Sequence, residues 1–390
     1  MIPRSAAPTL QRLAQGFPVV ALTGPRQSGK TTLARSVFKD KPYVSLENPE
    51  EREFALGDPK RFLGRFAQGA ILDEVQRCPQ LMSWLQGWVD ERQIMGDFVL
   101  TGSAQFDLIA GMTQSLAGRV GRVELLPLSA QELAASGHLS GAMSQALLRG
   151  GYPALFDRPV SPQDWFANYM ATYVERDVRQ LIAVRDLGQF QTFVKMCAAR
   201  TGQLLNLASL GADCGVSAVT AKQWLSVLET SYIITLLRPH HRNFGKRLVK
   251  TPKLYFLDSG LAAWLLGIRN SETLETHAAR GALFETWVVS ELYKQRLNAG
   301  RPLDLYFWRD SSGHEVDIII ETSAGLAPVE IKSGSTYASD WPDGLKKWQK
   351  FAQSDGLEAV IVYGGSNSYE REGVQVCGWR DMAQTLSLAA

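Results

Sequence analysis

Short apolar runs separated by polar, helix-favouring segments occur throughout the first 130 residues of the chain. The runs at 17–22, 70–72 and 98–100 have the length and composition of buried strands, and polar residues follow each of them. Weaker strand patterns occur at 42–46 and 123–126. Strands that alternate with helices form a parallel α/β sheet, which binds ligands at the carboxyl ends of its strands. We therefore predict the α/β class, with functional residues directly after the strands.

The middle of the chain changes to a helical period. Trp165, Phe166, Tyr169 and Tyr173 recur at helical spacing, and this aromatic stripe is most simply part of a core.

Two further predicted helices, 204–210 and 219–228, flank the turn Gly215-Val216-Ser217, where the serine can cap the second helix. This order is the outline of a helix-turn-helix. Strand patterns at 232–237 and 253–257 would complete a winged helix.

The pattern changes again after residue 280. A strong helix is predicted at 281–295, and strand patterns follow at 305–308, 313–320 and 328–332. The apolar run at 359–363 is predicted to be the last strand. These elements predict a second α/β domain.

The length of 390 residues is too great for one ordinary core and indicates two or three domains. We place three domains, at residues 1–150, 151–278 and 279–390. Hydrophobic content of 45% and charged content of 21% are those of a globular protein. Because the net charge is only +2, any nucleic-acid surface has to be a local patch.

The four cysteines are scattered, which argues against a zinc site and against a disulfide framework. No apolar run approaches the ~18 residues of a membrane helix. The first residues also lack the apolar core of a signal peptide. We expect a cytoplasmic protein with no membrane partner.

The clearest chemical motif joins the first predicted strand to the following helix. It comprises Gly24, Pro25, Arg26, Gln27, Ser28, Gly29, Lys30 and Thr31, followed by Thr32, and it fits G-x-x-x-x-G-K-[ST]. Backbone N–H groups of such a loop, with the helix N-terminus, bind phosphate oxygens. Lys30 is placed to reach the β- and γ-phosphates, and the Thr31 hydroxyl to ligate Mg²⁺. The motif predicts ATP and Mg²⁺ as cofactors.

Polar residues at the ends of two other strands complete the predicted site. In P-loop enzymes an acid at this place holds Mg²⁺ and a neighbouring glutamate polarises the attacking water. We assign Asp73 to the metal and Glu74 to the base. Ser103, or else Thr101, can sense the γ-phosphate from the tip of the neighbouring strand.

Two arginines lie at the turn before the strand pattern at 123–126. Phosphoryl transfer leaves negative charge on the γ-phosphate, which an arginine from a neighbouring subunit can neutralise. Arg119 is the first candidate and Arg122 the alternative, while two solvated arginines remain the simpler explanation.

Together, the segments 24–31, 71–74, 100–105 and 116–122 resemble those of AAA-type ATPases. The sequences Gly150-Gly151-Tyr152-Pro153 and 173–177 resemble the group that carries a C-terminal DUF4143 domain. This resemblance implies a P-loop ATPase core followed by a winged helix and a PD-(D/E)xK nuclease-like fold.

A cluster of basic residues lies between the two strands of the predicted winged helix. It comprises Arg238, Arg242, Lys246, Arg247 and Lys250, with His240 and His241 assigned to the same patch. Such a wing can lie along a phosphate backbone and give salt-dependent DNA affinity. The alternative is a winged helix that serves as an ATPase lid or a protein contact.

Acidic residues and a lysine coincide on the last predicted strands. Glu330 and Lys332 share one face of a strand, and Asp317 begins the neighbouring strand. With Glu285 from the preceding helix, they would form an oxygen-rich Mg²⁺ site beside a cation. The set resembles the PD-(D/E)xK nuclease fold. Whether it cuts DNA stays open, because a fold does not specify a function.

We therefore predict a Mg²⁺-dependent ATPase of AAA type that acts on DNA, with motor and nuclease roles both open. We expect a homo-oligomer, for which a hexameric ring is one arrangement. The alternative is a nucleotide-dependent switch whose C-terminal domains bind protein.

Overall fold

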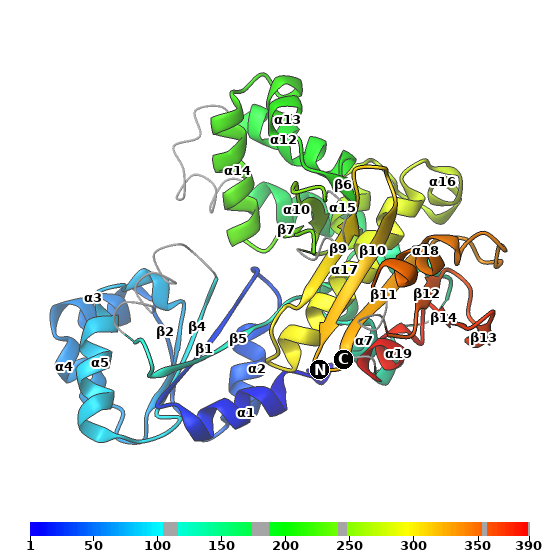
Figure 1. The fold of residues 1–390 in the computed structure, drawn as a ribbon. Coiled ribbons are helices and arrows are strands. Elements are labelled where there is room, and N and C mark those ends of the chain that lie inside the picture. Colours follow the sequence, from blue (N-terminus) through cyan, green and yellow to red (C-terminus); the bar gives the residue numbers. More distant parts are fainter. Residues whose placement is uncertain (104–115, 140, 174–186, 241–247, 353–356, 389–390) are drawn as a thin grey trace.

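The computed structural model covers residues 1–390 and describes all of them except 104–115, 140, 174–186, 241–247, 353–356 and 389–390. Three sheets organise the described residues, with five, six and three strands (Figure 1). Among these residues, no helix is both long enough and apolar enough to cross a membrane.

The N-terminal sheet has the strand order β2-β3-β4-β1-β5, and every neighbouring pair is parallel. Its strands are β1 (Val19–Gly24), β2 (Tyr43–Ser45), β3 (Ala70–Asp73), β4 (Phe98–Ser103) and β5 (Val120–Glu124). The helices are α1 (Ala7–Gly16), α2 (Lys30–Val37), α3 (Pro49–Gly57), α4 (Pro59–Gly64), the short 3-10 helix η1 (Val75–Arg77) and α5 (Leu81–Arg92). The predicted parallel α/β class is confirmed, although β5 begins three residues before the predicted strand.

Both faces of this sheet are apolar because helices cover both of them. On one face, Val20 and Leu22 of β1 pack with residues of α1 and α2. On the other, Val19 and Ala21 pack with residues of α4 and α5. This explains why β1 is a continuous apolar run rather than an alternating one.

The middle of the chain consists of helices around a three-stranded sheet in the order β6-β8-β7. Its helices are α7 (Ala130–Ala135), α8 (Met143–Arg149), α9 (Ala154–Asp157), α10 (Pro162–Tyr173), α12 (Leu187–Ala199), α13 (Leu207–Asp213), α14 (Ala218–Thr230), α15 (Ser259–Leu265) and α16 (Ser271–Thr276). Its strands are β6 (Gln203–Leu204), β7 (Ile234–Leu237) and β8 (Lys253–Phe256).

Two sequence predictions for this region agree with the structure. The aromatic stripe of α10 is buried, and the rings of Trp165 and Tyr169 stack with centroids 4.9 Å apart. The Ser217 hydroxyl caps α14 by accepting a hydrogen bond from the Thr220 amide at 3.1 Å. The identity of this region as a winged helix stays a prediction.

The C-terminal sheet has the order β13-β14-β12-β11-β10-β9 and mixes parallel with antiparallel pairs. Its elements are α17 (Arg280–Asn298), β9 (Leu305–Arg309), β10 (Glu315–Thr322), β11 (Gly325–Lys332), α18 (Asp343–Ala352), β12 (Val360–Tyr363), β13 (Tyr369–Arg371), β14 (Val374–Gly378) and α19 (Met382–Leu388). The prediction that the run at 359–363 is the last strand is wrong. Residues 364–373 are largely polar and hide β13, whereas the short alternation Val374-Gln375-Val376 of β14 was a usable signal that was missed.

The long helix α17 joins the middle region to the C-terminal sheet. One continuous core contains Phe284 and Val288 of α17, Phe193 of α12, Tyr255 of β8 and Val329 of β11. The opposite face of the sheet is covered by α18 and has a core of its own. Contacts across α17 therefore connect the two regions directly.

Candidate functional site

The loop between β1 and α2 curls around its own lysine. Gly24 has φ of +146°, and a Cβ there would come within 2.2 Å of the Leu125 carbonyl oxygen, so the position requires glycine. Gly29, with φ of +90°, directly precedes α2. The Lys30 ammonium donates hydrogen bonds to the carbonyl oxygens of Gly24 and Pro25, at 3.1 and 2.7 Å. The cation thus lies inside the loop, where phosphate oxygens would be expected.

Asp73, at the end of β3, collects three hydroxyl groups. The Thr31 hydroxyl lies 3.1 Å from Asp73 Oδ1, and the Tyr43 hydroxyl donates to Oδ2 at 2.7 Å. Thr101 also donates to this carboxylate. Burial, followed by the hydrogen bond to Asp73, raises the pKa of Tyr43 to about 12. A threonine hydroxyl beside a carboxylate is a donor set that suits Mg²⁺ with nucleotide phosphates, so these residues fit the predicted ion.

Glu74 follows Asp73 in a left-handed backbone conformation, with φ of +56°. The Gln76 side-chain amide donates to the Glu74 carboxylate and also to the Ser103 hydroxyl, the latter at 3.1 Å. Glu74 and Ser103 are therefore linked through one amide group. Sequence reasoning missed Gln76, although its position two residues after Glu74 was a usable signal.

A cavity of about 490 Å³ opens beside the loop. The loop side and the strand β3 side contribute Arg26, Gln27, Gly29, Lys30, Thr31, Thr32 and Glu74. The opposite wall consists of Pro153, Ala154, Asp157, Arg158 and Thr172, from α9, α10 and the residues beside α9. These wall residues were missed, although Gly150-Gly151-Tyr152-Pro153 had marked this part of the chain. A Cβ at Gly151 would lie 2.4 Å from the Leu128 carbonyl oxygen, so glycine allows this close approach.

Arg4 supports the loop from behind and was also missed. Its guanidinium donates to the Ser28 carbonyl oxygen at 2.6 Å and to the Leu126 carbonyl oxygen at 2.7 Å. The same group pairs with Glu132 at 3.1 Å, and both side chains are buried. Arg4 therefore ties the loop to α7.

The two predicted arginines form ion pairs within their own chain. Arg119 binds both carboxylate oxygens of Asp90, at 2.5 and 2.8 Å. Arg122 pairs with Glu124 at 3.1 Å. Neither side chain lines the 490 Å³ cavity. Their action on a neighbouring subunit stays a prediction.

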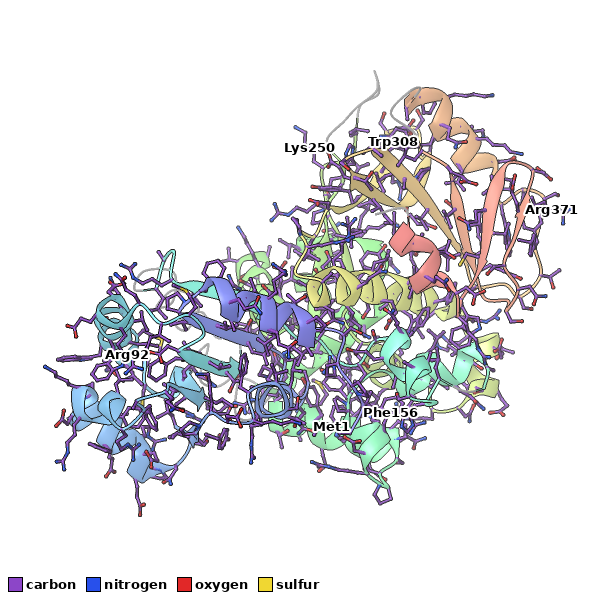
Figure 2. All side chains as sticks on the ribbon, turned by 90° about the horizontal axis from the view of Figure 1, so that it is seen from below. Met1, Arg92, Phe156, Lys250, Trp308 and Arg371 are labelled. Carbon is purple, nitrogen blue, oxygen red and sulfur yellow. The ribbon has the colours of Figure 1, made fainter. Side chains whose placement is uncertain are left out.

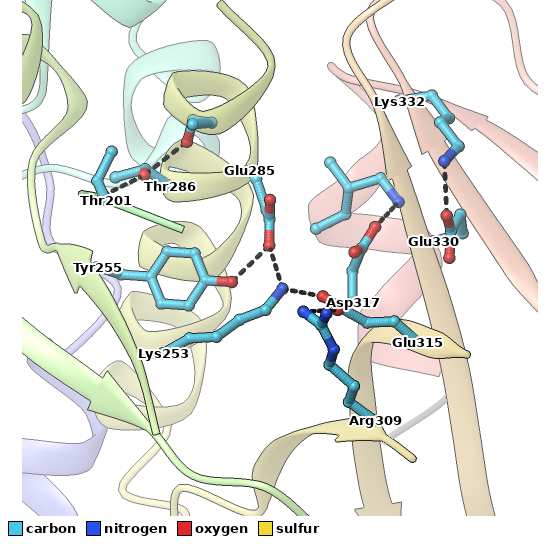
Figure 3. A network of polar contacts seen from close by, with 12 residues as sticks. Thr201, Lys253, Tyr255, Glu285, Thr286, Arg309, Glu315, Asp317, Glu330 and Lys332 are labelled. Atoms are coloured by element: carbon cyan, nitrogen blue, oxygen red, sulfur yellow. Dashed lines mark hydrogen bonds and ion pairs between the residues drawn. The ribbon is translucent and has the colours of Figure 1, made fainter. Parts of the chain in front are cut away.

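The structure brings the predicted acidic residues of the C-terminal sheet near one another (Figure 3). The Lys332 ammonium pairs with Glu330 at 2.6 Å, and Asp317 accepts a hydrogen bond from the Ile331 amide at 2.8 Å. Glu285 lies across from them on α17.

The oxygen-rich Mg²⁺ site stays a prediction, and the carboxylates assigned to it have basic partners. Within the described part of the chain, no three histidine, cysteine, aspartate or glutamate side chains gather closely enough to hold a metal ion. The physical reason is that Glu285 binds the Lys253 ammonium at 3.0 Å and Glu330 binds Lys332, so basic side chains hold these two carboxylates. Sequence reasoning missed Lys253 because it lies in a strand of the middle region.

Two solved structures have a related but distant arrangement. The Walker-type ATPase PABY2304 of Pyrococcus abyssi is 14% identical, with a TM-score of 0.45, and the match covers 68% of this chain and 96% of that chain. A RuvB variant of Thermotoga maritima is 21% identical, with a TM-score of 0.32 and coverage of 60% and 88%.

Matches to domain families and to two relatives identify the family of this chain. An AAA domain matches residues 16–134, the domain of unknown function DUF8612 matches 141–272, and the domain of unknown function DUF4143 matches 280–382. Uncharacterized proteins of Mycobacterium tuberculosis and Mycobacterium bovis are each 36% identical over 337 residues, covering 85% of this chain and 74% of theirs. The chain belongs to this family of AAA-domain proteins with a C-terminal DUF4143 domain.

In this AAA–DUF4143 protein, the basic segment between β7 and β8 is attached to the C-terminal sheet at both of its ends. The Phe307 amide donates to the Arg238 carbonyl oxygen at 3.1 Å, and the Val249 amide donates to the Arg309 carbonyl oxygen at 3.1 Å. Lys250 lies near Trp308 in Figure 2. The two described ends therefore follow the edge strand β9.

The predicted DNA contacts are only partly described. The side chains of Arg238 and Lys250 are exposed, whereas Arg242, Lys246 and Arg247 lie outside the described residues. His240 is buried, with its ring 5.2 Å from that of Tyr306, so its assignment to the basic surface patch is wrong. The sequence could not reveal this burial, because it depends on the contact with β9.

Proposed function

We propose that this AAA–DUF4143 protein hydrolyses ATP with Mg²⁺ at the site formed by Lys30, Thr31, Asp73 and Glu74. The observation that supports this proposal most directly is the contact of 3.1 Å between the Thr31 hydroxyl and the Asp73 carboxylate. It lies beside the loop and its lysine, next to a cavity of about 490 Å³.

The residues divide the chemical work as follows. Lys30 exchanges its carbonyl partners for β- and γ-phosphate oxygens, while Thr31 and Asp73 would hold the ion. When bound, Mg²⁺ supplies positive charge that offsets the charge on the phosphate oxygens. Glu74 accepts a proton from the attacking water, as a general base does. Ser103, which the Gln76 amide links to Glu74, orients that water or the γ-phosphate, and Thr101 is the alternative residue for this role.

Measurement of phosphate release from ATP tests this function. Purified protein should hydrolyse ATP with Mg²⁺, and EDTA should stop the reaction. Absence of both adenine nucleotide binding and turnover with Mg²⁺ present would refute the proposal.

We further propose that the ATPase acts on DNA. Exposed cations at Arg238 and Lys250 support this proposal, because basic side chains next to a nucleic-acid surface release counterions on binding. ATP turnover should increase with duplex, single-stranded or junction DNA, and DNA binding should weaken as salt rises. The combined variant Arg238→Ala/Lys250→Ala should weaken binding to all sequences similarly.

A nucleotide-dependent switch whose C-terminal part binds protein is the second candidate. The observation that favours it is the pairing of both ends of the basic segment with β9, which limits how far a wing could extend. Absence of DNA stimulation and of salt-sensitive DNA binding would support this candidate over DNA action.

We also propose that the chain forms a homo-oligomer, for which a hexameric ring is one arrangement. Arg119, or else Arg122, would then reach the γ-phosphate of a neighbouring subunit. Mixing Arg119→Ala subunits with Glu74→Gln subunits tests this idea, because mixed assemblies should recover turnover at interfaces that keep both residues. The same mixture with Arg122→Ala distinguishes the two arginines.

A further inference from the structure

Carboxylates from two elements of the C-terminal part converge on a lysine from another sheet (Figure 3). Glu285 comes from α17, and Glu315 and Asp317 come from β10. Lys253 is the first residue of β8, which belongs to the three-stranded sheet of the middle region. The cluster therefore crosses the junction between these two regions.

Lys253 makes close contacts with two of these carboxylates. Its ammonium lies 3.0 Å from Glu285 Oε1 and 2.5 Å from Glu315 Oε1, and only 3% of its side chain is exposed. Tyr255, two residues further along the same strand, donates its hydroxyl to Glu285 at 2.5 Å. Alternate residues of a strand share one face, so β8 presents both groups to α17 together.

Two further basic side chains pair with carboxylates of the cluster. Arg309 pairs with Glu315 at 3.0 Å, and Lys332 pairs with Glu330 at 2.6 Å. Three of the four carboxylates thus have a basic partner, and the fourth, Asp317, accepts a backbone amide hydrogen bond.

This donor set does not suit Mg²⁺ as it stands. Mg²⁺ requires a near-octahedral shell of oxygen atoms at about 2.0–2.1 Å, usually with several waters. A buried ammonium between Glu285 and Glu315 would repel a divalent cation placed beside it. Two carboxylate oxygens within 3.0 Å of the Lys253 nitrogen stabilise its charged form.

We propose that Lys253 is the resident cation of this carboxylate cluster, and that the cluster joins the middle region to the C-terminal sheet instead of holding Mg²⁺ for DNA cleavage. This role is independent of ATP hydrolysis and of DNA binding elsewhere on the chain. In this proposal the carboxylates of the cluster stabilise the fold and do not catalyse DNA cleavage.

Thermal unfolding of the full chain tests the junction. Lys253→Met leaves two half-buried carboxylates without their shared cation, and it should lower the melting temperature by about 5–15 °C. Glu285→Gln should also lower it, and the double variant should lose less than the sum of the two single losses. Lys332→Met is the matched control, because its partner Glu330 is on the same strand and its ammonium is more exposed; a loss of about 0–4 °C is expected.

Manganese binding tests the identity of the cation. Mn²⁺ is titrated into nucleotide-free protein that carries Asp73→Asn, so that the ATP site does not contribute, and bound ion is measured by electron paramagnetic resonance. Protein that retains Lys253 should bind no Mn²⁺ at this cluster. Lys253→Met should gain one Mn²⁺ site, and adding Asp317→Asn should remove it.

Several results would overturn the proposal. The first is Mn²⁺ binding by protein that retains Lys253, if the Asp317→Asn change abolishes that binding. The second is Mg²⁺-dependent DNA cleavage by protein that retains Lys253, if Asp317→Asn abolishes the cleavage. Additive losses in the unfolding cycle, or a folded Lys253→Met variant that gains no Mn²⁺, would equally contradict it. If Lys253→Met does not fold, two measurements still test the proposal. One is the Mn²⁺ titration of protein that retains Lys253. The other is the melting temperature of Glu285→Gln, which should fall, and of Lys253→Arg, which should stay close to that of the wild type because arginine keeps the positive charge.

Discussion

This protein has two carboxylate centres, and they differ in the groups that face the carboxylates. Asp73 of the N-terminal sheet faces the hydroxyl groups of Thr31, Tyr43 and Thr101 beside a cavity. Glu285 of the C-terminal part instead faces the buried ammonium of Lys253. Hydroxyl groups can share a carboxylate with a metal ion, whereas a fixed ammonium takes the place of the ion.

The difference shows that residue identity alone does not define a metal site. Both centres have acidic residues in the order expected from their motifs, and both are partly buried. Other elements of the fold contribute the partners of these carboxylates. Those partners determine which centre can bind a metal ion.

The largest effect is expected from Lys30→Ala. The change removes the ammonium held inside the loop at 2.7 Å from Pro25 O, and with it the charge that contacts the phosphates. We expect kcat/KM for ATP to fall by at least about 10³-fold, beyond the loss from one transition-state donor. Lys39→Ala, an exposed lysine just beyond α2, is the matched control and should retain wild-type turnover. Unchanged hydrolysis by Lys30→Ala would remove the loop from the active site.

Glu74→Gln should separate binding from chemistry. The amide preserves the size of the side chain but cannot accept the proton of the attacking water, so kcat should fall about 10²-fold or more. Equilibrium binding of ATP, measured by fluorescent nucleotide titration, should be unchanged. A variant that loses binding and turnover in equal measure would indicate that Glu74 holds the nucleotide and is not the base.

Most of the N-terminal site could be predicted from the sequence, because it is local. Lys30 and Thr31 belong to one short loop motif. Asp73 lies at the end of β3, which pairs in parallel with β4. Residues such as Arg158 and Arg4 could not be predicted, since they reach the loop only through packing between distant segments.

The C-terminal centre shows the same limit more strongly. Asp317, Glu330 and Lys332 lie on adjacent strands, and the sequence predicted their proximity correctly. Lys253 is more than 30 residues from Glu285 along the chain and reaches it from another sheet. No local period or motif encodes such a contact, so the sequence predicted a metal site where the structure has an ion pair.

Arg158→Ala should have a smaller effect on the ATP site. Arg158 follows α9 and lines the cavity wall opposite the loop, where its guanidinium can approach the phosphates. Because the side chain is exposed, we expect KM for ATP to rise only about 10-fold, the lower end for a charge-assisted hydrogen bond. Arg269→Ala, in the exposed segment after α15, is the control and should leave KM unchanged. An unchanged KM in Arg158→Ala would show that this wall does not contact the nucleotide.

The smallest effect is expected from Tyr43→Phe, which removes the hydroxyl that donates to Asp73 Oδ2 at 2.7 Å. Because the pKa of Tyr43 is raised to about 12, first by burial and then by this hydrogen bond, the donor proton stays in place at neutral and mildly alkaline pH. Losing it should let Asp73 rotate and raise the Mg²⁺ concentration for half-maximal ATP turnover about fivefold, as expected for one hydrogen bond worth ~1 kcal/mol. At saturating Mg²⁺ the turnover should return to the wild-type value, and Tyr369→Phe, in the C-terminal sheet, should change neither quantity. If Tyr43→Phe leaves the Mg²⁺ requirement unchanged, Asp73 is positioned by Thr31 and Thr101 alone.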